Sequence, residues 1–246
     1  TGVAGESGGV IRVYSSSCTV NLWNIDVESQ AGAAVASEGG LISCSGTVSL
    51  YDCNLTGGRA TGKGGNIQLS SSGTLRMFGG SLTGGKAPTG GNINVNGRLW
   101  MERVTVSGGS IYSYTEKQCV YNGIISDNLN ARMGKVTLMG LVDIEKLSLH
   151  EECTLIDGGI STGSKLVVTA TPETSRVIMV EATQAGFDSL ISFEPVDYPF
   201  SYDPAKKTVT ATCTIVEREH TNSHCVCAGN IAGAHTCASI CTSTAY

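Results

Sequence analysis

Four nitrogen and sulfur donors lie close together near the C-terminus: Cys225, Cys227, His235 and Cys237. Zn²⁺ in a structural site prefers a closed tetrahedral set of such donors. Residues 220–246 carry few large apolar side chains, so a cross-link must offset their ordering entropy. We therefore expect a structural zinc in a small Cys/His knuckle. The alternatives are disulfides among these cysteines and the neighbouring Cys241, or free thiols.

Carboxylates that could perform acid–base catalysis or bind Ca²⁺ are sparse. A lyase or hydrolase built on repeated strands needs two or three acids at matching positions, and a lyase also needs a basic residue. Only Glu102, Asp143 and Glu145 are expected at such outward positions, with Arg76 and Arg103 nearby. Solvated surface charge explains them most simply, and no G-x-S-x-G or H-E-x-x-H motif occurs. We assign no catalytic residues, although convergence of the three acids with a base would favour an enzyme.

Aromatic residues recur at one outward position of three consecutive repeats, namely Trp23, Tyr51 and Phe78. Trp100 lies two residues earlier in the fourth repeat. Stacked at strand spacing, these rings would form an exposed apolar strip suited to sugar rings or protein partners. The alternative is a structural stack that stabilises the sheet or is covered by a neighbour. These four residues are the candidate ligand-binding site.

An internal repeat must position these side chains. Gly-Gly pairs recur every 25 to 31 residues, each followed by a run whose second residue is Ile: Gly8-Gly9, Gly39-Gly40, Gly64-Gly65 and Gly90-Gly91. We interpret the pairs as turns that need positive φ. The repeat predicts two buried columns, one of Ile11, Ile42, Ile67 and Ile93, and one of Val20, Val48, Leu75 and Leu99.

Within each repeat, apolar residues step by two, then three, then two, as in Val48, Leu50, Cys53 and Leu55. A step of two keeps side chains on one face of a strand, and a step of three marks a bend. Each unit is thus a coil of three short strands, and the linkers 56–63 and 83–89 project as loops from one edge. Weaker copies are expected at 119–126 and at 142–149, the latter with Val136 and Leu138 as its first strand. About seven coils would then stack at strand spacing.

The predicted fold is all-β: a right-handed parallel β-helix, or solenoid, with the small C-terminal Cys/His knuckle. The period is too short for a propeller blade and too regular for a β-sandwich. We expect repeat coils over 1–164, terminal strands and a cap over 165–219, and the knuckle over 220–246. Cys44, Cys53 and Cys119 replace aliphatic residues of the repeat, so we expect reduced core cysteines there rather than disulfides.

Residues 56–109, with the phrases GGN-I-x-V and T-L-R-M-F-G-G-S-L-T-G-G, resemble the β-helix repeats of very large surface proteins from Gram-positive gut bacteria. That group is pectate-lyase-like in structure. The phrase H-C-V-C-A-G followed by H-T-C resembles the short Cys/His module that follows such repeats. Two departures are the loss of the repeat over 150–215 and the presence of Cys241. The resemblance implies this architecture and an extracellular or cell-surface location, but such folds host lyases, hydrolases and adhesins alike.

Charge excludes two partner classes. The net charge of -5 provides no basic field for nucleic acid or an anionic membrane surface. No apolar run is long enough for membrane insertion, and residues 1–20 lack a signal-peptide pattern, so we expect an excised part of a longer protein. We expect a non-catalytic surface-display or adhesin-like β-helix that binds glycan or a host or cell-surface protein. The alternative is a polysaccharide lyase or glycoside hydrolase on the same fold.

Overall fold

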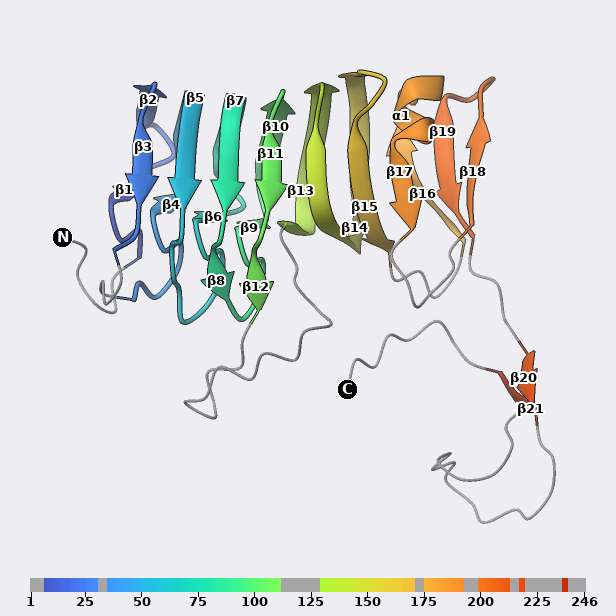
Figure 1. Cartoon of the computed structure of the whole chain (residues 1–246), viewed down its shortest axis with the longest axis horizontal. Helices are drawn as coiled ribbons and strands as arrows, with labels where there is room; N and C mark the ends of the chain where they lie inside the picture. The colour runs from blue at the N-terminus through green and yellow to red at the C-terminus, as the bar shows by residue number, and fades with distance from the viewer. Residues whose placement is uncertain are drawn as a thin grey trace, which may run out of the picture.

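The computed structural model describes residues 7–30, 35–111, 129–170, 175–192 and 199–212, and the short strands 217–219 and 236–238. The described residues form a β-solenoid of about 5 turns, and 60% of them lie in strands and 3% in a helix. Strands of successive turns lie side by side along a rod (Figure 1). The predicted all-β parallel solenoid is therefore confirmed.

Each turn contributes strands to three parallel sheets. The first sheet stacks β1 (Ile11–Val13), β4 (Ile42–Cys44), β6 (Ile67–Leu69), β9 (Ile93–Val95) and the start of β13 (Leu129–Gly140). The second stacks β2 (Thr19–Trp23), the first parts of β5 (Thr47–Thr56) and β7 (Thr74–Thr83), β10 (Arg98–Glu102) and the end of β13. The third stacks β3 (Asp26–Glu28), the ends of β5 and β7, β11 (Thr105–Ser107) and the start of β14 (Asp143–Ile160).

Apolar residues of successive turns form the two expected columns. The first contains Ile11, Ile42, Ile67 and Ile93, and the second contains Val20, Val48, Leu75 and Leu99. In the interior turns these side chains are at most 2% exposed. Ile11 and Val20, in the first turn, are only partly buried. The predicted register of the first four turns is confirmed.

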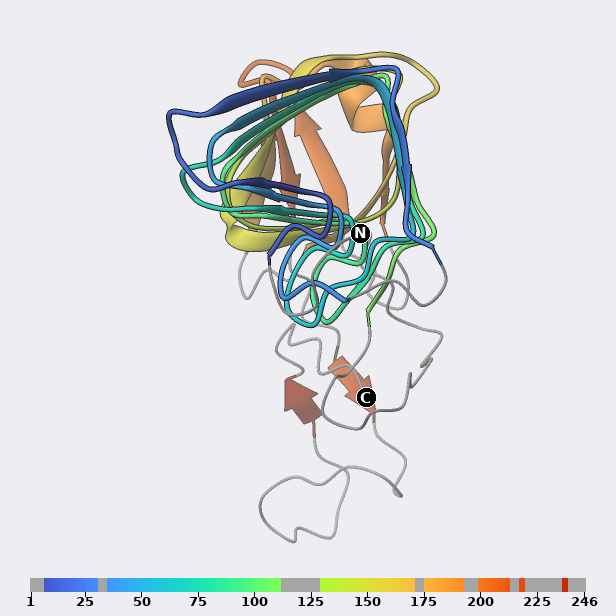
Figure 2. The ribbon, with the colours of Figure 1, turned by 90° about the vertical axis from the view of Figure 1, so that its left-hand side faces the viewer.

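The step of three is a sharp bend between the second and third sheets. The residue at the bend has positive φ in every one of five turns: Asn24 (51°), Asp52 (49°), Gly79 (78°), Arg103 (56°) and Gly140 (63°). A single left-handed residue reverses the side-chain alternation, which keeps the apolar residues on both sides of the bend facing inward. Figure 2 shows the bends superposed along the rod.

The Gly-Gly pairs serve two different purposes. Gly64 has a φ of +66°, so the first position of the pair needs the left-handed region that glycine adopts freely. A Cβ on Gly65 would collide with the carbonyl oxygen of Gly91 and the backbone nitrogen of Lys86 in the next turn. The second glycine is therefore required by the close approach of neighbouring turns.

The linkers lie at one edge of the rod, where they stack from turn to turn (Figure 2). Ala36 bridges to Ala60, and the backbone nitrogen of Ala60 donates to the Lys86 carbonyl at 2.9 Å. One turn later, β8 (Lys86–Ala87) pairs with β12 (Ser110–Ile111). The three alanine side chains at positions 36, 60 and 87 are fully buried. The predicted position of the linkers at one edge is confirmed (Figure 2), and small residues let the linkers also pack on one another.

Two buried asparagines support the stacked linkers. The Asn66 amide donates to Asn92 Oδ1 at 2.8 Å and to the Thr83 carbonyl at 3.0 Å, while its own oxygen accepts from the Gly58 N–H at 2.7 Å. Asn92 repeats this contact with Gly85 at 2.9 Å. These bonds satisfy backbone groups that would otherwise be buried without partners.

The register of the later turns differs from the sequence-based expectation. Val136 and Leu138 pair with β10, so they belong to the second sheet and not to the first. Ile144 pairs with β11 in the third sheet, whereas Leu147 pairs with the start of β13 in the first sheet of the next turn. The expected copy over 142–149 therefore spans two turns and was wrong. The copy at 119–126 lies outside the described residues, and about 5 turns replace the expected seven.

Cysteines inside the rod are free thiols that pack as small hydrophobes. Cys44 and Cys53 are at most 1% exposed, and the described cysteines form no disulfide. Burial raises the pKa of Cys44 to about 11, although hydrogen bonds to the carbonyls of Thr74 and Gly46 oppose the shift. The predicted reduced core cysteines are confirmed at these two positions, whereas Cys119 and the tail cysteines 225 and 227 lie outside the described residues.

The C-terminal end of the rod changes to antiparallel pairing. After β15 (Lys165–Ala170), β17 (Leu190–Ser192) continues the parallel stack, but β16 (Arg176–Val180) pairs antiparallel with β19 (Thr208–Ala211), which pairs with β18 (Phe200–Asp203). The short helix α1 (Gln184–Asp188) lies at the same end (Figure 1). Phe187 of α1 stacks on Tyr202, whose hydroxyl donates to the Ala182 carbonyl at 2.9 Å.

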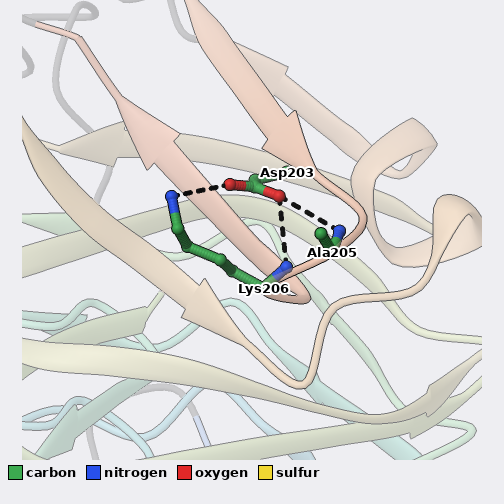
Figure 3. Close-up of polar contacts among 3 residues, drawn as sticks. All are labelled: Asp203, Ala205 and Lys206. Carbon is green, nitrogen blue, oxygen red and sulfur yellow. Dashed lines mark hydrogen bonds and ion pairs between the residues drawn. The ribbon is translucent and has the colours of Figure 1, made fainter.

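A tight turn joins β18 to β19. The Asp203 carboxylate accepts from the backbone N–H groups of Ala205 and Lys206 at 3.0 and 3.1 Å, and it contacts the Lys206 ammonium at 2.9 Å (Figure 3). The Lys206 side chain and these N–H groups lower the pKa of Asp203, and Asp203 raises the pKa of Lys206. The carboxylate thus stabilises the hairpin that closes this end.

Candidate ligand-binding surface

The predicted aromatic residues project from the outer face of the second sheet. Trp23, Tyr51 and Phe78 are register partners on β2, β5 and β7. Leu50 and Met77, one residue earlier on their strands, are fully buried. Alternation along each strand therefore places the three rings outside the rod, in the predicted column.

The three rings stack on one another. The Trp23 and Tyr51 centroids are 5.3 Å apart with a 7° angle between the ring planes, and those of Tyr51 and Phe78 are 5.1 Å apart with a 12° angle. Both faces of Tyr51 are therefore covered, and the stack stabilises the sheet through cross-strand pairs. Trp23 is 58% exposed, so the first ring of the stack has one open face.

Trp100 lies in the neighbouring outward column. Its register partners are Arg76 on β7 and Thr137 on β13. The side chain is 37% exposed, and it stacks on no other ring of the described residues. Trp23 and Trp100 are thus the two rings of this face that are available to a ligand.

Basic residues surround Trp100 on the same face, and two of them were not recognised from the sequence. Arg98 lies two residues before Trp100 on β10, and Lys135 is the register partner of Arg98 on β13. Leu99 is buried, so the alternation of side chains along β10 places its neighbour Arg98 on the outer face. Lys135 could not be placed from the sequence, because its strand was assigned to the wrong sheet.

The three acids considered for catalysis do not share one column. Glu102 follows Phe78 in the aromatic column of the second sheet, and its carboxylate lies 3.7 Å from the Arg103 Nε. Asp143 lies in the third sheet, where it pairs with Thr105. Glu145 Oε2 accepts from the Gly108 N–H at 2.6 Å. Glu102 thus lies on the second sheet, whereas Asp143 and Glu145 lie two residues apart on the outer side of β14.

The outward column of the third sheet that contains Asp143 is polar in the preceding turns. Asn54 donates from Nδ2 to Asp26 Oδ1 at 2.8 Å, and the Ser81 hydroxyl donates to Asn54 Oδ1 at 2.8 Å. These side chains hydrogen-bond from turn to turn on the outside of the rod. Such contacts stabilise the stacking of neighbouring turns.

Three of the predicted zinc ligands, Cys225, Cys227 and His235, lie outside the described residues. Cys237 lies in β21 (Thr236–Ala238), which pairs antiparallel with β20 (Glu217–Glu219). The donor set of three thiols and one imidazole suits Zn²⁺ chemically, so the zinc site stays a prediction. Within the described ranges, no group of three or more His, Cys, Asp or Glu side chains is arranged to hold a metal ion.

The described residues thus define a parallel β-solenoid whose second sheet carries an aromatic and basic outer face. No protein-family model, curated protein or solved structure matches the chain. None of the helices in the described part has the length and apolar composition that crossing a bilayer requires.

Proposed function

We propose that this chain is a non-catalytic, glycan-binding β-helix of the surface-display or adhesin type, acting outside the cell or at its surface. One observation carries the proposal: aromatic residues from four consecutive turns share one outer face, and Trp23 and Trp100 on it are 58% and 37% exposed. Sugar rings bind to aromatic rings through their apolar faces, so exposed tryptophans are suitable platforms.

The rod supports this use because it holds the rings rigidly. Backbone pairing fixes neighbouring turns at about 4.8 Å, and the stack of Trp23, Tyr51 and Phe78 restricts ring rotation. A preorganised surface loses little conformational entropy when a ligand binds. A long glycan chain that lies along the rod can contact several turns at once.

A glycan array tests the proposal. We expect the full chain to bind at least one glycan class, and we expect Trp100→Ser and the triple change Trp23→Ser, Tyr51→Ser, Phe78→Ser to weaken that binding. Leu141→Ser is the matched control, because Leu141 is 56% exposed but lies outside this face. Thermal melts of each variant separate lost binding from lost folding.

Two results would contradict the proposal. One is that no glycan binds the full chain, which would leave a protein partner or a structural role for the aromatic stack. The other is that the aromatic variants bind as well as the Leu141→Ser control does. A lyase or hydrolase would need Glu102, Asp143 and Glu145 to converge with a base. Instead, Glu145 accepts a hydrogen bond from the Gly108 N–H, and Glu102 lies beside Arg103 on another sheet.

A further inference from the structure

A cationic cluster surrounds Trp100 on the outer face of the second sheet. Arg76 lies beside Trp100 on β7, Arg98 lies two residues before it on β10, and Lys135 lies beside Arg98 on β13. The strands β7, β10 and β13 are adjacent in the rod (Figure 1). Adjacent strands are about 4.8 Å apart, and alternate residues of one strand are about 6.6 Å apart. Three long basic side chains therefore reach the surroundings of one indole ring.

No acidic side chain of the described residues forms an ion pair with these basic groups. Arg76, Arg98 and Lys135 are all exposed. On the described parts of β2, β5, β7, β10 and β13, the acids are Asp52, at the bend of β5, and Glu102, which contacts Arg103. The basic groups are thus available to an external anion.

The cluster contrasts with the charge of the whole chain. The net charge is -5, yet this face carries three exposed basic residues around an exposed tryptophan. Structural stability does not require such a cluster, because like charges on neighbouring positions of a sheet repel each other. A bound anionic ligand would relieve that repulsion.

We infer that the ligand of this surface is an acidic glycan, whose sugar ring stacks on Trp100 while its anionic groups bind Arg76, Arg98 and Lys135. The inference rests on the proposed glycan-binding function and names its ligand class. Guanidinium groups bind carboxylate and sulfate in a bidentate geometry, and the ammonium of lysine adds a point charge. A neutral glycan would stack on the indole but leave the three charges unpaired.

Binding of the full chain to polymers that differ only in charge tests this inference. The first pair of probes is hyaluronan, which carries carboxylates, and its neutral methyl ester; the second pair is chondroitin sulfate and unsulfated chondroitin. We expect hyaluronan to bind about tenfold or more tightly than the ester, with binding that weakens as salt rises. A preference for chondroitin sulfate over unsulfated chondroitin would show that sulfate adds to the binding of the carboxylate.

Variants locate the effect on this face. The triple change Arg76→Gln, Arg98→Gln, Lys135→Gln removes three positive charges and should abolish the preference for acidic over neutral polymer. The control Arg59→Gln, Lys165→Gln, Lys207→Gln removes three exposed positive charges elsewhere and should keep it. Melting curves verify that both variants fold.

The possible failures are distinguishable. Equal binding of hyaluronan and its ester, or equal loss in the two triple variants, overturns the inference while glycan binding itself stands. Binding to neutral glycans of the array and to no acidic glycan would likewise overturn the inference and leave glycan binding itself intact. Absence of binding to every glycan removes the proposed function, and the inference falls with it.

Discussion

The two ends of the rod are built differently. At the N-terminal end, β1, β2 and β3 each pair with a strand on one side only, within the part of the chain that the structure describes. The exposed large apolar side chains concentrate there, since Val10, Tyr14, Trp23 and Ile25 are 37% to 79% exposed. At the C-terminal end, antiparallel strands and α1 follow the last parallel turn.

The difference shows what buries a residue in a solenoid. Ile11 and Ile67 occupy the same column with the same side chain, but only Ile67, which has turns on both sides, is fully buried. Burial in such a fold depends on both neighbouring turns, so stability is the sum of turn-to-turn contacts. Among the described residues, the first turn is thus open on one side, whereas antiparallel strands cover the last parallel turn.

The largest effect is expected for Ile67→Asp. An unpaired carboxylate in the middle of the apolar column should lower the free energy of unfolding by about 4 kcal/mol. Ile11→Asp is the matched control, because the same change at the open end leaves the carboxylate in contact with water and should cost much less. Urea unfolding monitored by circular dichroism measures both. If both variants lost the same free energy of unfolding, either Ile67 would not lie in the buried column or Ile11 would not be partly exposed to solvent.

Asp157 should be the most sensitive polar position of the closed end. Its buried carboxylate accepts from the Thr183 N–H and hydroxyl at 2.8 and 2.7 Å, and from the N–H groups of Ile160 and Gly159 at 2.7 and 2.9 Å. Burial alone would raise the pKa of Asp157, but the hydrogen bonds from Ile160, Thr183 and Gly159 overcome it and lower the pKa. We expect Asp157→Asn to lower stability by about 2 kcal/mol.

The same carboxylate predicts a pH dependence. Because the folded-state pKa lies below the unfolded value of about 3.9, the charged form stabilises the fold above about pH 4. This contribution is lost as the pH falls from there through the folded-state pKa. Melting curves of the wild type and Asp157→Asn should converge in that range. Asp188→Asn, in the same end of the rod, is the control and should stay parallel to the wild type.

A smaller effect is expected in local opening. The amides of β2 that face the open end lack a neighbouring strand among the described residues, so β2 should exchange its amide hydrogens faster than β7. We expect a difference of about tenfold or more in hydrogen-exchange rates. Protection of β2 equal to that of β7 would show that the N-terminal end is covered in solution.

The smallest effect on the rod should come from the C-terminal donors. Elemental analysis of protein purified without added metal should find about one zinc per chain, and Cys225→Ser should remove it while Cys241→Ser does not. Neither change should shift the melting of the rod. The zinc should be released at acidic pH, because protons compete for thiolate and imidazole. Metal-free protein without titratable thiols in the tail would instead show disulfides.

The sequence by itself determined the coil, the register of the first four turns and the side on which each residue lies. Side chains alternate along a strand with a period of two. The sequence alone therefore predicted that the column of Ile67 faces inward and that the column of Tyr51 faces outward. The reduced state of Cys44 and Cys53 followed from the same pattern. In these turns, the Gly-Gly pair that precedes each Ile-containing run marks where a repeat begins.

Only the tertiary structure decided features that depend on contacts between distant residues. No Gly-Gly pair occurs between Gly109 and Val136, so the boundary of this turn became visible only through the pairing of Val136 with β10. The bonds from Asn66 to Thr83 and from Thr183 to Asp157 join residues that share no local pattern. The cluster of Arg76, Arg98 and Lys135 likewise forms only when three turns stack, because a sequence states which residues alternate but not which turns are neighbours.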